Sequence, residues 1–397
     1  MSELSYLEKL LDGVEVEWRN LGDTSLFEIA NNGRKPVKAS LRIAGETPYY
    51  GANNIQDYVD GYTHDGEYVL IAEDGSASLE NYSIQYATGK FWANNHVHVV
   101  RGKERVHSRF LYHYLCIVNF LPFLTGGGRA KLTKGQLIEI PVPIPCPDNP
   151  EKSLAIQSEI VRILDKFTAL TAELTAELNM RKKQYNHYRD QLLSFEDGEV
   201  EWKALEEVSD IYDSLHQTPQ YSKNGLSMIR VTDIKNGYID LKNTLKVNDG
   251  IFSIFTKKYL PQKNDLVMSR VGSYGNVGII PTDNSACMGQ NTVVIHPHIN
   301  NRYLFYILTS SIGQDFIEKN VGGGSQKTLS LKSIKSIPIP LTGESEQSKI
   351  VSILDKFDTL TTSISEGLPR EIELRQKQYV YYRDLLFSFP RPETASN

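Results

Sequence analysis

The sequence has few cysteines and no long apolar run. Its three cysteines lie far apart, form no CxxC pair and have no His at ligand spacing: Cys116, Cys146 and Cys287. This pattern argues against a disulfide framework or a structural zinc site and fits a reducing cytoplasm. The acidic start, MSELSYLEKLLDG, lacks the apolar segment of a secretory signal. The longest apolar stretches, such as IVNFLPFL at 117–124, are far shorter than the ~20 residues that span a bilayer. A soluble, cytoplasmic protein without a membrane partner is therefore predicted.

The sequence also lacks recognisable catalytic motifs. It has no NPPF- or DPPY-like tetrapeptide for amino methylation, no GxGxxG after a strand and no GxxxxGK[ST] phosphate loop. The adjacent carboxylates Glu73 and Asp74 are a weak nuclease signal, and a solvated turn is the favoured interpretation. Four histidines do not fall at metal-ligand spacing on one helix: His64, His96, His98 and His107. The sequence therefore favours a binding protein with no cofactor or metal of its own.

What the chain does have is a strong internal repeat. QSEIVRILDKFTALT at 157–171 matches QSKIVSILDKFDTLT at 347–361, and RKKQYNHYRDQLLSF at 181–195 matches RQKQYVYYRDLLFSF at 375–389. The second copy follows the first by 190 residues in one block and by 194 in the other, so the two copies differ in length by four residues. Such self-similarity is the first feature to explain in a fold prediction.

A weaker repeat surrounds the strong one. VEW occurs at 16–18 and 200–202, and glycine-rich segments at 126–134 and 322–332 each precede an IPVPIP-like sequence. In addition, YLEKLLDGVEVEW at 6–18 resembles YRDQLLSFEDGEVEW at 188–202, as if the N-terminus were the tail of a repeat that begins at the C-terminus. This pattern predicts a circularly permuted arrangement whose ends lie together around a pseudo-twofold axis.

The repeated segments are predicted to be helices. Their apolar residues recur every three or four positions, with charged flanks, as in a coiled-coil seam. Each helix needs a partner, and the simplest partner is the other copy, packed antiparallel. Gly367 and Pro369 predict a break or kink in the second helix. The intervening segments are rich in Gly, Tyr, Asn and β-branched residues and are predicted to be mixed α/β globules.

The net charge of the chain hides regional differences. The whole chain carries 43 Lys and Arg against 48 Asp and Glu, which as an average argues against a nucleic-acid partner. Residues 46–80, however, contain eight acidic and no basic residues, whereas residues 90–134 have a net charge of +7 and residues 215–340 also have +7. Both intervening segments thus contain a basic stretch suited to binding phosphates. The alternative is that these stretches are ordinary solvated surface.

Residue types that contact nucleic acid are present in both basic stretches. Arg can pair with guanine, Asn and Gln with adenine, aromatic rings can stack on splayed bases, and glycines let backbone amides approach phosphate. Each position taken singly has the alternative of a turn glycine or a structural side chain. In the first segment the candidates are Tyr49, Tyr50, Asn53, Asn54, Asn94, Asn95, Gly127, Arg129, Lys131 and Lys134. In the second they are Arg230, Arg270, Ser273, Asn276, Gln290, Asn291, Gly323, Ser325, Gln326 and Lys327.

The motifs ILDKF, RKKQYNHYRDQLLSF and RQKQYVYYRDLLFSF resemble the specificity subunit of type I restriction–modification systems. The tandem TAELTAEL at 171–178 and GLPREIELRQKQY at 367–379 are similar to its IC subgroup. The resemblance covers essentially the whole chain. It implies an α+β fold with two mixed α/β DNA target recognition domains separated by two long antiparallel coiled-coil helices, pseudo-twofold and circularly permuted. The expected boundaries are 1–148 and 198–341 for the recognition domains and 149–197 and 342–397 for the helical regions.

The resemblance also implies a non-catalytic role within a complex. Each recognition domain would read one half of a bipartite, asymmetric site in double-stranded DNA. The helices would set the spacer between the halves and dock two modification (methyltransferase) subunits that methylate adenine N6, with restriction subunits adding ATP-dependent translocation and cleavage. S-adenosylmethionine, ATP and Mg are then expected on the partner subunits. The alternative is a coiled-coil assembly adaptor that does not itself read DNA.

Overall fold

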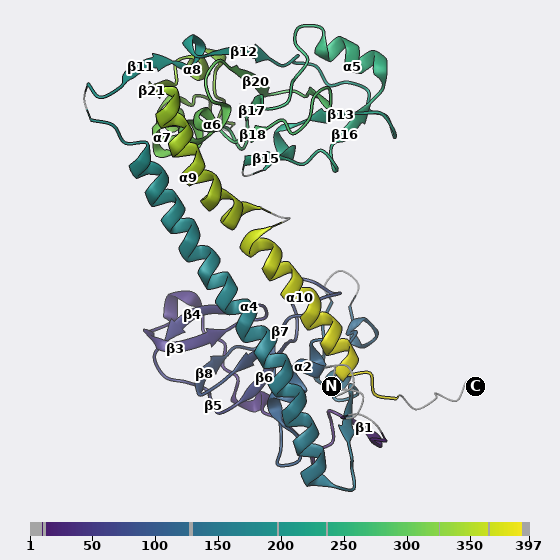
Figure 1. Cartoon of the computed structure of the whole chain (residues 1–397). Coiled ribbons are helices and arrows are strands. Elements are labelled where there is room, and N and C mark those ends of the chain that lie inside the picture. The colour runs from purple at the N-terminus through teal and green to yellow at the C-terminus, as the bar shows by residue number, and fades with distance from the viewer. Residues whose placement is uncertain are drawn as a thin grey trace. The chain divides into compact units, whose positions relative to one another are not determined.

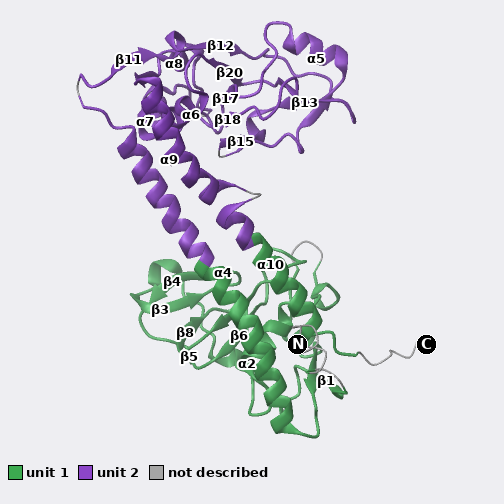
Figure 2. Cartoon of the chain, in the orientation of Figure 1, with its two compact units in different colours: residues 1–173, 373–397 green, residues 174–372 purple. Residues whose placement is uncertain are grey.

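The computed structural model describes residues 10, 13–126, 130–196, 198–235, 237–324, 326–363 and 366–390. The chain forms two compact units, shown in Figure 2. Unit 1 contains residues 1–173 and 373–397, and unit 2 contains residues 174–372. Unit 1 is therefore built from two separate stretches of sequence, whereas unit 2 is a single continuous stretch.

Unit 1 contains two four-stranded sheets and a two-stranded ribbon. One sheet has the order β2-β9-β6-β7, the other has the order β4-β3-β8-β5, and β1 pairs with β10. All five residues of β6, YVLIA, are buried, as expected for a short apolar run in the interior of a globule. The bounds are β1 Val16–Asn20, β2 Phe27–Ile29, β3 Ala44–Tyr50, β4 Ile55–Val59, β5 His64–Asp65, β6 Tyr68–Ala72, β7 Ile84–Ala87, β8 Lys90–Ala93, β9 Val97–Gly102 and β10 Pro141–Pro145, with short helices α2 Ser108–Leu115 and α3 Lys134–Leu137.

Unit 2 contains a six-stranded sheet, a three-stranded sheet and its own ribbon. The sheet orders are β12-β20-β17-β18-β15-β14 and β16-β13-β19, and β11 pairs with β21. The strands are β11 Glu201–Ala204, β12 Ser209–Asp213, β13 Leu226–Ile229, β14 Ile234–Lys235, β15 Gly237–Ile239, β16 Leu245–Val247, β17 Leu266–Ser269, β18 Val277–Ile279, β19 Ala286–Met288, β20 Thr292–Pro297 and β21 Pro338–Leu341. The short helices are α5 Asp249–Thr256, α6 Asn301–Thr309, α7 Ser311–Asn320 and α8 Leu331–Lys335.

The two ribbons are equivalent. In unit 1 the VEW strand pairs antiparallel with the PVPIP strand, with Trp18 opposite Pro143. In unit 2 the second VEW sequence contributes to the same kind of pair, with Trp202 opposite Pro340. Proline-rich strands suit a two-stranded ribbon because each strand has a free edge, where a missing N–H breaks no ladder. The weak sequence repeat therefore corresponds to a repeated structure.

The strong repeat forms the long helices. The first copy lies in one continuous helix, α4, which spans Pro150–Leu192 and runs through both units. The second copy is divided between α9, Glu344–Thr362, and α10, Gly367–Leu386, so the predicted break is confirmed. Gly367 has φ +76°, and a Cβ there would lie 2.5 Å from the Thr359 carbonyl oxygen, so no other residue fits without a shift. Among the described residues, no helix is long and apolar enough to cross a membrane.

In each unit, two antiparallel helical segments pack on one another and on the globule. The core of unit 1 includes Ile160 and Leu164 from α4 together with Leu386 of α10, and Phe167 stacks on Tyr382 with ring centroids 5.2 Å apart. Figure 1 shows α4 and α10 side by side in this unit. In addition, the Trp18 Nε1–H donates to the Pro390 carbonyl oxygen at 2.9 Å. The β1 strand and the segment after α10 therefore lie together, as the circular permutation predicts.

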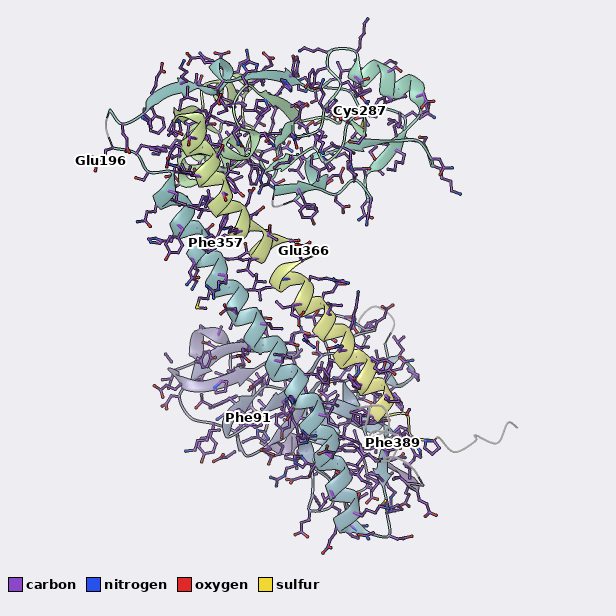
Figure 3. The ribbon with its side chains drawn as sticks, in the orientation of Figure 1. Phe91, Glu196, Cys287, Phe357, Glu366 and Phe389 are labelled. Atoms are coloured by element: carbon purple, nitrogen blue, oxygen red, sulfur yellow. The ribbon has the colours of Figure 1, made fainter. Side chains whose placement is uncertain are left out.

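Unit 2 repeats this arrangement with the other ends of the helices. Its core includes Tyr185 from the end of α4 and Ile350 and Leu354 from the start of α9. Tyr188 stacks on Phe357, which Figure 3 labels on α9, with ring centroids 5.7 Å apart. Each globule therefore packs against the beginning of one copy of the helical repeat and the end of the other. The predicted α+β fold with antiparallel helices is confirmed.

Candidate nucleic-acid interface

The flanks of the two glycine-rich segments pair in the same way. In unit 1, Thr125 and Lys131 exchange backbone N–H···O bonds of 2.9 and 2.8 Å, and in unit 2, Gly322 and Thr328 do so at 3.0 and 2.7 Å. Gly323 has φ +107°, and a Cβ there would lie 2.4 Å from the Gln326 carbonyl oxygen, so this hairpin requires glycine at that position. Of the predicted contacts, Gly127, Arg129 and Ser325 lie outside the described residues. We refer to these paired flanks, residues 125–126 with 130–131 and residues 322–324 with 326–328, as the glycine hairpins.

Each glycine hairpin is attached to the residue that follows a buried central strand. Leu132 N–H donates to the Glu73 carbonyl oxygen at 2.7 Å, and Leu329 N–H donates to the Arg270 carbonyl oxygen at 2.8 Å. Glu73 directly follows β6, and Arg270 directly follows β17. We call Glu73 and Arg270 the anchors. Their backbone hydrogen bonds are equivalent, but their side chains carry opposite charges.

In unit 1 the anchor carboxylate binds two cations. Glu73 accepts hydrogen bonds from Arg34 at 2.5 Å and forms an ion pair with Lys131 at 3.0 Å. Burial alone would raise the pKa of Glu73, but the hydrogen bonds from Arg34 and Lys131 outweigh it and lower that pKa. Lys131, a predicted phosphate contact, is consequently held at the base of the glycine hairpin.

A buried histidine supports the same anchor. The His98 Nε2–H donates to the Leu132 carbonyl oxygen at 2.7 Å, while its Nδ1 accepts from the Asn31 amide at 2.9 Å. These partners fit the neutral imidazole with its proton on Nε2. Burial lowers the pKa of His98, which also favours the neutral form. The interpretation of His98 as a core histidine rather than a metal ligand agrees with this environment. Among the described residues, no group of three or more His, Cys, Asp and Glu could hold a metal ion.

In unit 2 the anchor cation is held by a carboxylate. The Arg270 guanidinium donates to both oxygens of Asp213, at 2.7 and 2.8 Å, and its Nε–H donates to the Leu329 carbonyl oxygen at 3.1 Å. Arg230 is likewise bound by Asp233, at 3.0 and 2.9 Å. These two arginines were predicted to read bases, yet in this structure both guanidinium groups are occupied by carboxylates of the same unit.

Several other predicted contacts have structural roles in unit 1. Tyr49 is only 1% exposed and its hydroxyl accepts from Val37 N–H at 3.0 Å, and the buried Asn94 accepts from His96 N–H at 2.8 Å. Tyr50 packs edge-on against Phe91, and Asn53 is hydrogen-bonded to Gly75 and Ala77. The sequence could not separate these roles from base contact, because burial and hydrogen-bond partners depend on which distant residues the fold brings together.

The remaining candidates lie at the surface or in turns. Asn291 adopts φ +62°, a left-handed turn conformation that Asn tolerates, and Gln290 beside it faces the backbone of Gln217 and Thr218. Lys327 pairs with Glu318 at 3.3 Å while staying largely exposed. The candidates with exposed side chains, or an exposed glycine backbone, are Asn53, Asn54, Asn95, Lys131, Lys134, Ser273, Asn276, Gly323, Gln326 and Lys327.

Two surface features were missed by the sequence analysis. In unit 1, Leu41 and Ile43 are 70% and 71% exposed and border a cavity of about 270 Å³ that Lys35, Arg42 and Trp92 also line. In unit 2 a cavity of about 530 Å³ is bordered by Tyr212, Ser214, Phe255, Lys257 and Met288. Neither is encoded in a contiguous motif, since each set comes from several strands and loops. Cations beside exposed apolar groups were the only available signal.

Comparison with known proteins places these observations in a family. The type I restriction modification DNA specificity domain matches the chain twice, over residues 14–181 and 198–374. A putative type I restriction enzyme specificity subunit of Haemophilus influenzae is 47% identical, over 97% of this chain and 98% of its own length. The EcoR124I/EcoR124II specificity subunit of Escherichia coli is 39% identical, over the whole length of both chains.

The fold agrees with solved structures. The type I restriction–modification S subunit of M. genitalium superposes with a TM-score of 0.58 at 14% identity, covering 96% of this chain and 98% of that one. The two matches to the specificity domain together span most of the chain. The first covers a recognition globule and most of α4, and the second covers the other globule, α9 and the start of α10. The chain therefore belongs to the family of type I restriction–modification DNA specificity subunits.

Proposed function

We propose that this chain selects the DNA target of a type I restriction–modification complex, with each recognition domain reading one half of a bipartite, asymmetric site. The observation that carries the proposal is the duplicated scaffold with unlike reading faces. Both units present a glycine hairpin attached to a buried strand, but the anchor is Glu73 with two cations in one and Arg270 with a carboxylate in the other. Two faces of different charge and shape suit two different half-sites.

The proposed boundaries follow the repeats rather than the compact units. Recognition domain 1 comprises residues 1–148 and recognition domain 2 residues 198–341, with helical regions at 149–197 and 342–397. The bounds of α4, Pro150–Leu192, and the start of α9 at Glu344 support these limits. Within the proposed domains, the exposed polar groups on and beside the glycine hairpins would contact phosphates and base edges, with Lys131, Lys134 and Lys327 on phosphates.

The partners and cofactors follow from the proposed role. Specificity subunits are non-catalytic, so S-adenosylmethionine, ATP and Mg would be bound by modification and restriction subunits in the cytoplasm. The two modification subunits would dock on the helical regions. Exposed apolar side chains along these helices support this assignment, because they would be covered by a docked subunit: Met180, Val380 and Tyr381. A solved structure with a TM-score of 0.55 comes from work on complex assembly of a type I system.

The helices would also set the distance between the two half-sites. The TAELTAEL segment at 171–178 lies inside the uninterrupted α4, so one more TAEL unit would lengthen the helix by about 6 Å. At ~3.4 Å per base pair, the preferred gap would increase by one or two pairs. Methylation of a series of sites with different gaps measures this directly, and an unchanged optimum after the insertion would refute the spacer role.

Exchange of one recognition domain tests the proposal as a whole. Residues 19–148 are replaced by the corresponding segment of another specificity subunit, and the methylated sites of cells carrying the complete system are sequenced. One half-site should change and the other should stay. If both half-sites change together, the two-reader proposal is wrong, and if neither changes, the chain acts only as an assembly adaptor.

A further inference from the structure

A short helix in each unit belongs to the repeat although the sequences around it differ. SRFLYHYL at 108–115 forms α2, and NRYLFYIL at 301–308 forms most of α6. The two sequences share an arginine at the second position and leucines at the fourth and eighth positions. Both helices contribute to the core of their unit, where Leu111 and Leu304 are fully buried. Two otherwise unlike domains therefore carry the same helix at the same place in the chain.

The arginine of each short helix binds the aspartate of the ILDKF motif. In unit 1 the Arg109 Nε–H donates to Asp165 Oδ1 at 2.8 Å. In unit 2 the Arg302 Nε–H donates to Asp355 Oδ1, also at 2.8 Å. Each guanidinium also lies against aromatic rings of its own unit. Arg109 is 4.6 Å from the ring centroids of both Tyr86 and Tyr112.

A second donor from the next turn of the short helix reaches the same oxygen. The His113 Nε2–H donates to Asp165 Oδ1 at 2.7 Å, and the Tyr306 hydroxyl donates to Asp355 Oδ1 at 2.5 Å. His113 and Tyr306 occupy equivalent positions, four residues after the arginine. The side chain changes between the two units, but the hydrogen bond to the aspartate is kept.

A glutamine eight residues before each aspartate holds the start of the same short helix. Gln157 Oε1 accepts from His107 N–H at 2.8 Å, and Gln347 Oε1 accepts from Asn300 N–H at 3.4 Å. His107 and Asn300 are the N-cap residues of α2 and α6. Both glutamines are buried. We call these two pairs, Gln157 with Asp165 and Gln347 with Asp355, the clamps.

Each clamp is connected through packed elements to its glycine hairpin. Phe110 and Leu111 of α2 share a core with Val69 and Ile71 of β6, and β6 leads directly into the anchor Glu73. In unit 2, Leu304 of α6 shares a core with Leu266 and Met268 of β17, which leads into Arg270. A shift of the short helix on the long helix would therefore move the strand and the hairpin with it, because interiors are close-packed.

We infer that the clamps are positioning elements that fix each reading face on the repeated helix, and that they select the gap of the bipartite site rather than its bases. Two contacts eight residues apart lie on one face of the long helix and fix both the position and the rotation of the short one. Arginine suits this joint because its planar guanidinium can stack on rings while donating to a carboxylate. The inference rests on the proposed function.

The test uses the complete complex of the specificity chain with its modification subunits. Arg109→Ala and Arg302→Ala are made separately, and methylation rates are measured on sites with the preferred gap, on sites with one base pair more or fewer, and on sites with one substituted base in either half. Each variant should lower the preference for the best gap at least threefold. Discrimination against the substituted bases should change less than twofold in both halves.

Two controls keep the result interpretable. Lys203→Ala, on the exposed ribbon strand β11, should leave both ratios unchanged. If Arg109→Ala or Arg302→Ala does not fold, Asp165→Asn and Asp355→Asn keep the side-chain size and should give the same broadened gap preference.

The outcomes separate the clamp inference from the proposed function. An unchanged gap preference in the folded variants, or an equal loss of base discrimination, would overturn the positioning role and leave the clamps as structural contacts. Failure of the unsubstituted complex to distinguish any site would instead refute the proposed function.

Discussion

The clamps and the hairpin anchors show two different kinds of equivalence between the units. At the clamps the contact between the arginine and the aspartate is the same in both units, with the arginine Nε 2.8 Å from the aspartate Oδ1. At the anchors the backbone hydrogen bond is kept while the charge is reversed, Glu73 in one unit and Arg270 in the other. The attachment of each globule to the long helix is thus the same in both units, whereas the surface around the glycine hairpin differs between them. Substitutions at the anchors, on the hairpins and on the exposed face should separate these two roles.

The largest effect is expected for Arg270→Ala. This change leaves Asp213 without its main partner at a site where both side chains are largely buried, and it removes the bond to the Leu329 carbonyl oxygen. A loss of about 3 kcal/mol in the unfolding free energy is expected. Denaturant unfolding measures the loss, and methylation of substituted sites shows whether the second half-site is affected. Loss of base selectivity without loss of stability would instead make Arg270 a direct reader.

Glu73→Gln should have a smaller effect that depends on pH. Arg34 and Lys131 lose a charged acceptor, for an expected cost of about 2 kcal/mol at neutral pH. Because the pKa of Glu73 is lowered in the folded state, its stabilisation is present above the unfolded pKa of about 4.3 and is lost as the pH falls below it. The difference between the two proteins should therefore shrink in acid. Unfolding series at several pH values measure it, and a constant difference would contradict the ion-pair account.

Gly323→Ala should strain the second glycine hairpin. The substitution places a Cβ at φ +107° and 2.4 Å from a carbonyl oxygen, at an expected cost of about 1–2 kcal/mol. Gly324→Ala is the matched control, because a Cβ there meets nothing within 4 Å. Affinity for the second half-site should fall only for the Gly323 variant. Equal behaviour of the two variants would show that the hairpin conformation does not matter for binding.

Lys327→Ala should leave stability unchanged and weaken DNA binding. The side chain is largely exposed and pairs with an exposed glutamate, so the fold does not depend on it. If it contacts a phosphate, binding should weaken by a similar factor on all sequences, and the slope of log affinity against log salt should fall by about one. Fluorescence titrations at three salt concentrations give both values. A loss restricted to one target sequence would indicate a base contact instead.

The repeated helices could be predicted from the sequence because the two copies are closely similar and both have apolar residues every three or four positions. The break before Gly367 was predicted from Gly367 and Pro369, and the meeting of β1 with the segment after α10 from the permuted repeat. The anchors could not be predicted, since Arg34, Glu73 and Lys131 are far apart in sequence and meet only through the sheets. The burial of Tyr49 could not be predicted either, because the sequence of a short strand does not reveal which of its faces is covered.

The similarity of α2 to α6 was visible in the sequence but was obscured by the unlike residues around it. Only the arginine and two leucines stand at matching positions, too few to stand out before the aspartates were known to bind those arginines. The contact, rather than the pattern, identifies the repeat.

The contact between Trp18 and Pro390 has a consequence for the order in which the two units fold during synthesis. Unit 2 is one continuous stretch and can fold as soon as it leaves the ribosome, since domains generally form as units during synthesis. Unit 1 must wait with part of its interior open until Leu386, Phe387 and Phe389 arrive, because these side chains complete its core. Unit 1 is therefore translated first but completes its core last.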